Sequence, residues 1–140
     1  MLKFFLDQKR RTAEGGFTLI ELVVVLAILG ILLALAVPRY LGARKRAYKA
    51  EIDNILQEVK TLSWAYYQEQ NIFPTAIADI ALQMPGGAAW QTPTLTSGGG
   101  STTTIVWTAS GQASGFPVVP TDLCSVTLSS DGDSSQGCTF

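Results

Sequence analysis

The feature that most constrains this sequence is an unbroken apolar run near its N-terminus. Residues 17–37 read FTLIELVVVLAILGILLALAV, and the only polar side chains among them are Thr18 and Glu21. At 1.5 Å per residue, a helix of this length extends roughly 31 Å, which matches the hydrocarbon thickness of a bilayer. The run is therefore long enough to cross a membrane as a single helix.

Two general explanations of the apolar run leave one of its residues unexplained. The first is a secretory signal peptide, with basic residues before the run and a small-x-small cleavage site at 34–36. The run is longer than the apolar part of such a peptide, which has about 7 to 15 residues. The second is a plain single-span anchor for an exported domain. Neither accounts for Glu21, because a carboxylate inside a membrane costs about 2.5 to 3.5 kcal/mol and by default indicates a function.

The residues at the start of the run carry a resemblance to a known family. Gly16 ends a short charged leader, the letters FTLIE follow at 17–21, and Pro38 closes the apolar stretch. This pattern resembles the class III signal of type IV pilins and type II secretion pseudopilins, over about the first 60 residues. The resemblance implies cleavage after Gly16 by a membrane prepilin peptidase, N-methylation of the new N-terminus on Phe17, and polymerisation through the apolar helix.

Glu21 and the expected new N-terminus can form a pair of opposite charges. Cleavage after Gly16 would place a charged amine on Phe17, at the same edge of the apolar run as Glu21. A single chain satisfies this carboxylate only in part, but in a staggered stack of identical helices Glu21 of one copy can meet the Phe17 amine of the next. We expect this pair to set the register of a fibre. The alternative is a Glu21 side chain that snorkels to the lipid headgroups.

Small residues and a proline predict how the apolar helix packs and bends. Ala27, Gly30 and Ala34 share one helix face, a spacing that in lipid favours close approach of helices but also arises from composition alone. Pro38 removes a backbone hydrogen bond, and Gly30 weakens the turns before it. We therefore expect Gly30 and Pro38 together to produce a helix kink, which lies just beyond the membrane.

Helical periodicity resumes after Pro38. Apolar residues recur at spacings of three and four and form one stripe: Tyr48, Ile52, Ile55, Leu56, Val59, Leu62 and Tyr66. We expect one continuous helix over about 17–70, with residues 39–70 as its amphipathic half. The basic residues of 39–49 could contact lipid phosphates or nucleic acid, although a solvated face, or pairing with acidic neighbouring copies, is the simpler interpretation.

The remainder of the sequence predicts a small head. Pro74 breaks the long helix, and Thr75 is a candidate N-cap for a short helix through Met84. Segments with the composition of β-strands follow at 91–96, 102–108, 116–119 and 123–128.

These elements predict an α+β fold class of the type IV pilin kind, in which a long N-terminal helix packs on a small antiparallel sheet. Trp64, Trp90 or Trp107 is available for the core between the two layers. The expected domain order is a cleaved leader (1–16), a transmembrane and assembly helix (17–38), its amphipathic half (39–70) and the head (71–140).

Cys124 and Cys138 are the only two cysteines of the chain. No His or third Cys is present to complete a zinc site, so a disulfide is favoured over a buried thiol pair or half of a metal site. A disulfide would place the C-terminus outside the cytoplasm, and it is similar to the disulfide-bounded loop of type IV pilins. Inside this loop Asp131 and Asp133 are weak calcium candidates, and a plain Asp-Gly turn is the simpler interpretation.

The composition leaves little room for catalysis. The chain has no His, no phosphate-binding loop and no recognisable carboxylate pair, so we predict no catalytic residue, no cofactor and no resident metal. Lys60 is the last basic residue, and residues 61–140 carry acidic groups only. We therefore expect no direct binding of nucleic acid by the head.

Together these features predict a structural subunit of a type IV pilus-like fibre that serves adhesion, twitching motility or DNA uptake. The resemblance implies a precursor that crosses the cytoplasmic (inner) membrane once, with its C-terminus outside, and then enters an extracellular fibre. The implied partners are other copies of the chain, membrane lipid, the prepilin peptidase and methyltransferase, and an assembly platform with an ATPase motor. The alternatives are a pseudopilin of a type II secretion system and a membrane-anchored binding module.

Overall fold

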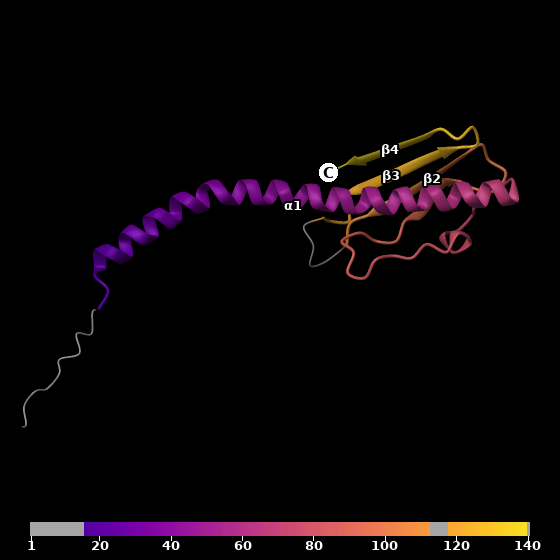
Figure 1. Ribbon diagram of the computed structural model, residues 1–140. Coiled ribbons are helices and arrows are strands. Elements are labelled where there is room, and N and C mark those ends of the chain that lie inside the picture. The colour runs from indigo at the N-terminus through magenta and orange to yellow at the C-terminus, as the bar shows by residue number, and fades with distance from the viewer. Residues whose placement is uncertain (1–15, 113–117, 140) are drawn as a thin grey trace, which may run out of the picture. The chain divides into compact units, whose positions relative to one another are not determined.

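The computed structural model describes residues 16–112 and 118–139 (Figure 1). It divides after Tyr40 into two units, which are described separately below. The elements are α1 (Leu19–Gln70), a short 3-10 helix η1 (Ile77–Ile80), and the strands β1 (Thr94–Gly98), β2 (Thr104–Ser110), β3 (Leu123–Ser129) and β4 (Ser134–Thr139). One long helix followed by an antiparallel sheet confirms the predicted α+β class.

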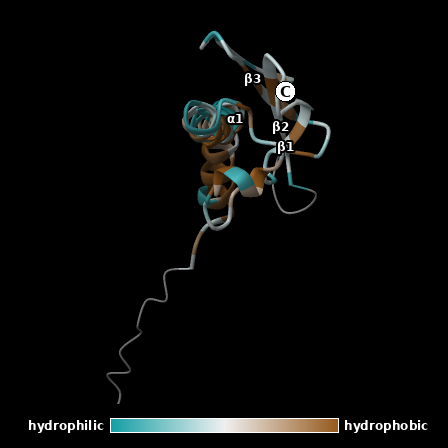
Figure 2. Ribbon diagram, turned by 90° about the vertical axis from the view of Figure 1, so that its right-hand side faces the viewer, coloured by the Kyte–Doolittle hydropathy of each residue, from teal (hydrophilic) through white to brown (hydrophobic). Residues whose placement is uncertain are grey.

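The first unit contains the apolar part of α1. Every side chain from 16 to 40 is exposed, and these turns are coloured mainly as hydrophobic in Figure 2. By length and composition, α1 includes a stretch that could cross a membrane. The helical assignment is unbroken through Gly30 and Pro38, which confirms the predicted continuous helix. The kink expected at these two residues stays a prediction.

The second unit, from Leu41 onward, is held together by the apolar stripe of α1. Ile52, Ile55, Leu56 and Val59 are all buried, as their spacing predicts. They join one hydrophobic core with the inner face of the sheet. Burial of apolar surface at roughly 25 cal/mol per Å² is therefore what keeps this half of the helix on the head.

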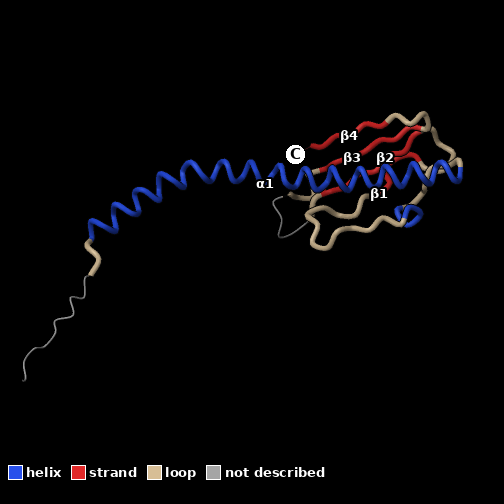
Figure 3. Tube along the Cα trace, in the orientation of Figure 1, coloured by secondary structure: helices blue, strands red, loops and turns tan. Residues whose placement is uncertain are grey.

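The sheet has the simplest possible topology. Its strands lie in the order β1-β2-β3-β4, and each neighbouring pair is antiparallel (Figure 3). Along β2 and β3 every second residue is buried, which is the alternation of a sheet with one face on a core and one toward solvent. The buried positions include Ile105, Trp107, Val126 and Leu128.

Two tryptophans fix the head on the helix through hydrogen bonds as well as packing. The Nε1–H of Trp107 donates to the hydroxyl of Ser63 at 3.0 Å, and the Nε1–H of Trp90 donates to the Tyr48 carbonyl at 2.9 Å. Both indoles are 1% exposed, so both donors needed a partner. The predicted use of tryptophan in the core is thus confirmed at two positions, while Trp64 is only half-buried.

The end of α1 at Gln70 lies where the sequence predicts it, four positions before Pro74. Asn71 takes a left-handed φ of 57°, and its N–H donates to the Tyr67 carbonyl at 2.8 Å. Asparagine tolerates this conformation better than most residues, so it can cap the C-terminus of a helix.

The short helix after Pro74 is smaller than predicted, and Thr75 does not act as its N-cap. It is a 3-10 turn over Ile77–Ile80 rather than an α-helix that reaches Met84. The carboxylate of Asp79 accepts hydrogen bonds from the N–H of Thr75 (2.8 Å), the N–H of Ala76 (2.9 Å) and the Thr75 hydroxyl (3.1 Å). These bonds, that from the Thr75 N–H foremost, lower the pKa of Asp79 below its ordinary value.

The strand predictions were correct at two strands and incomplete elsewhere. The segments predicted at 102–108 and 123–128 correspond to β2 and β3, whereas β1 begins three residues later than the predicted start of 91. Of the strand predicted at 116–119, residues 116 and 117 lie outside the described residues, and 118 and 119 form a loop. The fourth strand, β4, was missed because its sequence SSQGCT has no apolar alternation.

Candidate functional site

The start of α1 is closed by a reciprocal pair of hydrogen-bonding side chains. Thr18 directly precedes the helix, and both its N–H (2.9 Å) and its hydroxyl (2.7 Å) donate to Oε2 of Glu21. In return the N–H of Glu21 approaches the Thr18 hydroxyl oxygen at 3.3 Å. This arrangement is a capping box, in which two helix-start N–H groups find partners on side chains three residues apart.

The capping box leaves part of the Glu21 carboxylate available. Both bonds from Thr18 end on Oε2, and no hydrogen bond to Oε1 occurs within the described part of the chain. A carboxylate offers about four lone-pair positions. Glu21 can therefore cap its own helix with one oxygen and accept a cation with the other.

This cap was not predicted from the sequence. The Glu21 carboxylate was expected to be only partly satisfied within one chain, whereas Thr18 supplies two short hydrogen bonds to it. The signal was present, because TLIE at 18–21 fits the pattern S/T-x-x-E just before an apolar run. Pairing with a neighbouring copy was therefore not the only role that this residue pattern indicates.

Gly16 and Phe17 precede the helix and lie in irregular backbone. Phe17 is 84% exposed. A Cβ atom at Gly16 would meet no other atom within 4 Å. Neither residue is therefore packed against another side chain in the described part of the chain. A Cβ atom at Gly30, within the helix, would likewise meet no atom within 4 Å, so no contact among the described residues requires a glycine there.

The two cysteines form a disulfide, which confirms the favoured interpretation. The bond joins β3 to β4, where Cys124 and Cys138 lie directly opposite each other in the strand register. Cys124 is fully buried. The loop that the disulfide closes is therefore a β-hairpin, with both of its arms in the sheet.

The weak calcium candidates lie at the tip of this hairpin. Asp131 and Asp133 are exposed, and the turn between them is held by backbone bonds from Gly132 N–H to the Ser129 carbonyl (3.0 Å) and from Ser129 N–H to the Asp133 carbonyl (2.8 Å). Gly132 has a φ of 88°, which suits glycine. Within residues 16–112 and 118–139, no group of three or more His, Cys, Asp or Glu side chains is placed to hold a metal ion.

A long apolar helix with a capped carboxylate at its start, continued by a disulfide-bearing antiparallel head, defines a pilin-like subunit. Residues 11–37 match the family model described as the prokaryotic N-terminal methylation motif. The type IV narrow pilus major component PilA5 of Thermus thermophilus is 36% identical over 88 residues, which cover 63% of this chain and 74% of that protein. The chain belongs to the family of type IV pilins and type II secretion pseudopilins.

Two further relatives represent both branches of this family. Fimbrial protein EcpC of Eikenella corrodens is 37% identical over 78 residues, which cover 54% of this chain and 51% of that protein. Type II secretion system core protein G of Aeromonas hydrophila is 37% identical over 68 residues, or 49% of this chain and 46% of that protein. The chain thus spans about half the length of these two relatives.

Proposed function

We propose that this protein is a structural subunit of a type IV pilus-like fibre, built by stacking the N-terminal helices of many copies. The observation that carries the proposal is the pairing of two features in residues 16–40. All side chains there are exposed although most are apolar, and Glu21 offers a second carboxylate oxygen beside its own helix cap. The exposed apolar side chains require burial against lipid or another protein chain. The second carboxylate oxygen of Glu21 requires that one of these neighbours supply a cation.

Lipid covers the apolar helix in the precursor. The 21 residues of 17–37 are long enough to span a bilayer, and a helix satisfies all of its interior backbone groups by itself. The head carries a disulfide, so it lies on the oxidising side of the cytoplasmic membrane. The N-terminal leader then lies on the cytoplasmic side.

Other copies of the same helix cover it in the fibre. After cleavage between Gly16 and Phe17, the new amine carries a positive charge. The acidic side chain closest to it along the sequence of an identical copy is Glu21. With Oε2 engaged by Thr18, the amine of the next copy would bind Oε1. Such a pair in an apolar core contributes mainly to register, because desolvation offsets much of its attraction.

The small residues of the apolar helix support close packing between copies. Gly30 has no neighbour within 4 Å of a Cβ position in the single chain. Its small size therefore serves either helix flexibility or the approach of another helix. We assign the segments accordingly: leader 1–16, transmembrane and assembly helix 17–38, its amphipathic continuation 39–70, and head 71–140.

A pilus subunit is our first choice and a secretion pseudopilin our second. The Thermus pilus protein is covered over 74% of its length, and the cystine in the C-terminal hairpin favours the pilin branch. The match to a core protein of a type II secretion system favours the second. Both assignments involve a prepilin peptidase with methyltransferase activity and an assembly platform with an ATPase motor.

Mass spectrometry of sheared surface fibres tests the proposal. We expect this protein as a fibre component, with an N-terminus at methylated Phe17 and with Cys124 and Cys138 joined. An intact Met1, or a mature chain that starts at Val37, would contradict it and favour a plain anchor or a signal peptide. Deletion of the pilus motor or of the secretion motor then shows which machine the fibres require.

A further inference from the structure

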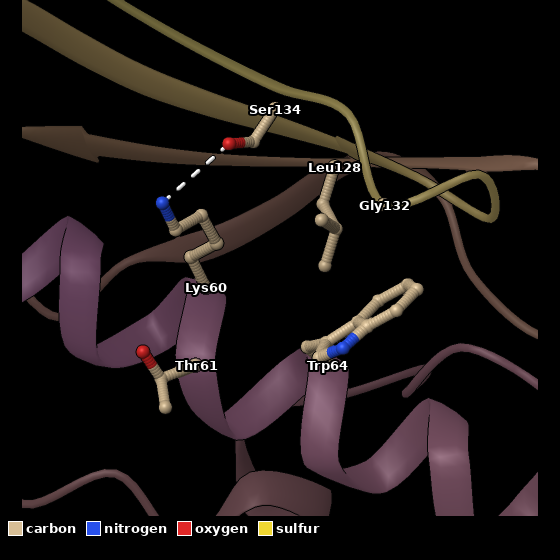
Figure 4. A pocket seen from close by; sticks show the side chains of 6 residues that line it. All are labelled: Lys60, Thr61, Trp64, Leu128, Gly132 and Ser134. Carbon is tan, nitrogen blue, oxygen red and sulfur yellow. Dashed lines mark hydrogen bonds between the residues drawn. The ribbon is translucent and has the colours of Figure 1, made fainter.

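The head contains a cavity that neither the fold nor the proposed assembly explains. It has a volume of about 270 Å³ and lies between α1, the end of β3 and the β3–β4 turn (Figure 4). Six residues line it: Lys60, Thr61, Trp64, Leu128, Gly132 and Ser134. All six belong to the second unit of the structure.

One wall of the cavity is a rigid indole. Trp64 stacks on Tyr67 with ring centroids 5.5 Å apart, and Tyr67 stacks on Phe73 at 4.5 Å. Phe73 is fully buried, so the stack is anchored in the core and holds the half-buried indole at its outer end. Such a wall loses little conformational entropy when a ligand packs on it.

The β3–β4 turn is shaped to pass close to this indole. A Cβ atom at Gly132 would lie 3.7 and 3.8 Å from two carbons of the Trp64 ring. A larger side chain at this position would therefore extend over the six-membered part of the indole and into the cavity. Leu128 adds a second apolar surface next to the indole (Figure 4).

The rim of the cavity is polar and carries one charge. Lys60 lies one helical turn before Trp64, and its Nζ lies 3.5 Å from the Ser134 hydroxyl. Among the described residues that line the cavity, Lys60 alone is charged. In the described part of the chain, Lys60 has no carboxylate within 4.0 Å, whereas Lys49 of the same helix pairs with Asp53 at 2.9 Å.

The hydroxyls of the rim have capacity left for a ligand. Thr61 donates its proton to the Gln57 carbonyl at 2.9 Å, so its oxygen can still accept a hydrogen bond. Ser134 contributes a second hydroxyl beside the ammonium group. A ligand that suits this site has an apolar face, hydroxyl groups and one negative charge.

We propose that this cavity binds one unit of an acidic sugar, such as a uronic acid residue of an extracellular polysaccharide. The C–H face of the sugar ring packs on Trp64, its carboxylate pairs with Lys60, and its hydroxyls bond Ser134 and Thr61. The volume lies below the ~300 Å³ at which pockets for drug-sized ligands begin, which fits one ring rather than an extended ligand. The carboxylates of Asp131 and Asp133 stand on the same turn but do not line the cavity.

Nuclear magnetic resonance on the full chain in detergent micelles tests the proposal independently of fibre assembly. The reporter is the indole N–H resonance of Trp64, assigned by its loss in Trp64→Phe. The probes are galacturonate, galactose and acetate, which present the complete ligand, the neutral ring and the carboxylate alone. We expect a saturable shift with galacturonate, at least fivefold weaker binding of galactose, and no shift with acetate at the same concentrations.

Substitutions that change the charge of Lys60 should affect binding without unfolding the head, because a change at this rim removes no core atom. Lys60→Gln should abolish the preference for galacturonate over galactose, and Lys60→Glu should abolish galacturonate binding. Lys49→Gln, a control on the same helix, should leave both unchanged. The proposal is overturned if galacturonate fails to shift the Trp64 resonance, or if it binds Lys60→Gln as tightly as the natural chain.

Discussion

The two units of this molecule differ in whether their apolar residues are buried. In the head, Trp90 and Trp107 are buried and each indole N–H has a partner on α1. In the N-terminal unit every side chain from 16 to 40 is exposed. Its only side-chain hydrogen bonds within the described residues join Thr18 and Glu21.

This difference separates what the chain specifies by itself from what its surroundings must supply. The head has a complete core, and in the described residues no buried side-chain polar atom is left without a partner. The apolar helix has backbone hydrogen bonds, but its side chains over residues 16–40 are all exposed. Changes in the head should therefore alter stability, whereas changes in the N-terminal unit should alter processing and assembly.

The largest effect expected is at the cleavage site. Gly16→Phe should block removal of the leader and abolish fibres, because a prepilin peptidase must accommodate the residue before the scissile bond. A Cβ atom at this position meets nothing within 4 Å in the described part of the chain, so misfolding would not explain the loss. Immunoblots of membranes should show only the uncut precursor. Gly42→Phe, at an equally open glycine, should leave cleavage normal, and normal cleavage of Gly16→Phe would refute the prediction.

The next largest effect concerns stability and contrasts the two units directly. Trp107→Ala removes a fully buried indole and leaves the Ser63 hydroxyl without its donor, which should cost about 3 to 5 kcal/mol of head stability. Leu29→Ala, in the exposed apolar helix, should leave head stability unchanged. Denaturant titration of the chain in detergent, followed by near-ultraviolet circular dichroism, measures both. Equal losses of head stability in the two variants would contradict the separation of the chain into a self-sufficient head and an exposed apolar helix.

Removal of the disulfide should have a smaller effect. Replacement of Cys124 and Cys138 by serine releases the constraint on the β3–β4 hairpin, and the chain-entropy model gives a loss of about 3 kcal/mol for a loop of this size. The same titration in reducing and non-reducing buffer checks the value, with the double serine variant insensitive to reductant. A natural chain whose stability does not respond to reductant would argue against the prediction.

The smallest effect expected is a local dependence on pH at η1. Hydrogen bonds from Thr75 and Ala76 lower the pKa of Asp79. Its carboxylate therefore stabilises the folded turn at any pH above the ordinary aspartate pKa of about 3.9. This stabilisation is lost as the pH falls from the ordinary pKa through the lowered pKa of the folded state. The amide resonance of Ala76 should report this titration, and Asp79→Asn should abolish it. A titration at or above the ordinary value would contradict the geometry.

The sequence predicted those parts of the structure that depend on local patterns. The continuous α1 and the buried stripe of Ile52, Leu56 and Val59 follow from apolar residues that recur at short spacing, and such a pattern can be recognised without knowledge of its tertiary partners. The cysteine pair was also correctly interpreted, because the absence of His removes the main competing use.

The parts that escaped prediction depend on contacts between distant residues. Strand β4 has no apolar alternation, and its place comes from pairing with β3 and from the disulfide. Ser63 is buried because Trp107, which lies 44 positions later, needs an acceptor. The Trp64 cavity likewise forms only when the β3–β4 turn closes over α1. None of these contacts leaves a periodic trace in the sequence.

The most direct test of the central claim separates the two roles of Glu21. Glu21→Gln can keep the cap with Thr18, because glutamine also serves at this position of a capping box, but it removes the charge that would pair with the Phe17 amine of the next copy. Glu21→Leu removes both. The measurement is the yield of sheared fibre relative to the mature subunit in the membrane.

If the charge pair sets the register, both variants should insert normally, with Glu21→Leu at least as well as the natural chain. Fibre yield should fall on the order of a hundredfold or more for each, since a broken buried pair costs about 3 to 5 kcal/mol. Thr18→Val, which keeps the charge and weakens the cap, should assemble far better than either. Natural fibre yield from Glu21→Gln would show that Glu21 acts through its cap alone, and it would contradict the account.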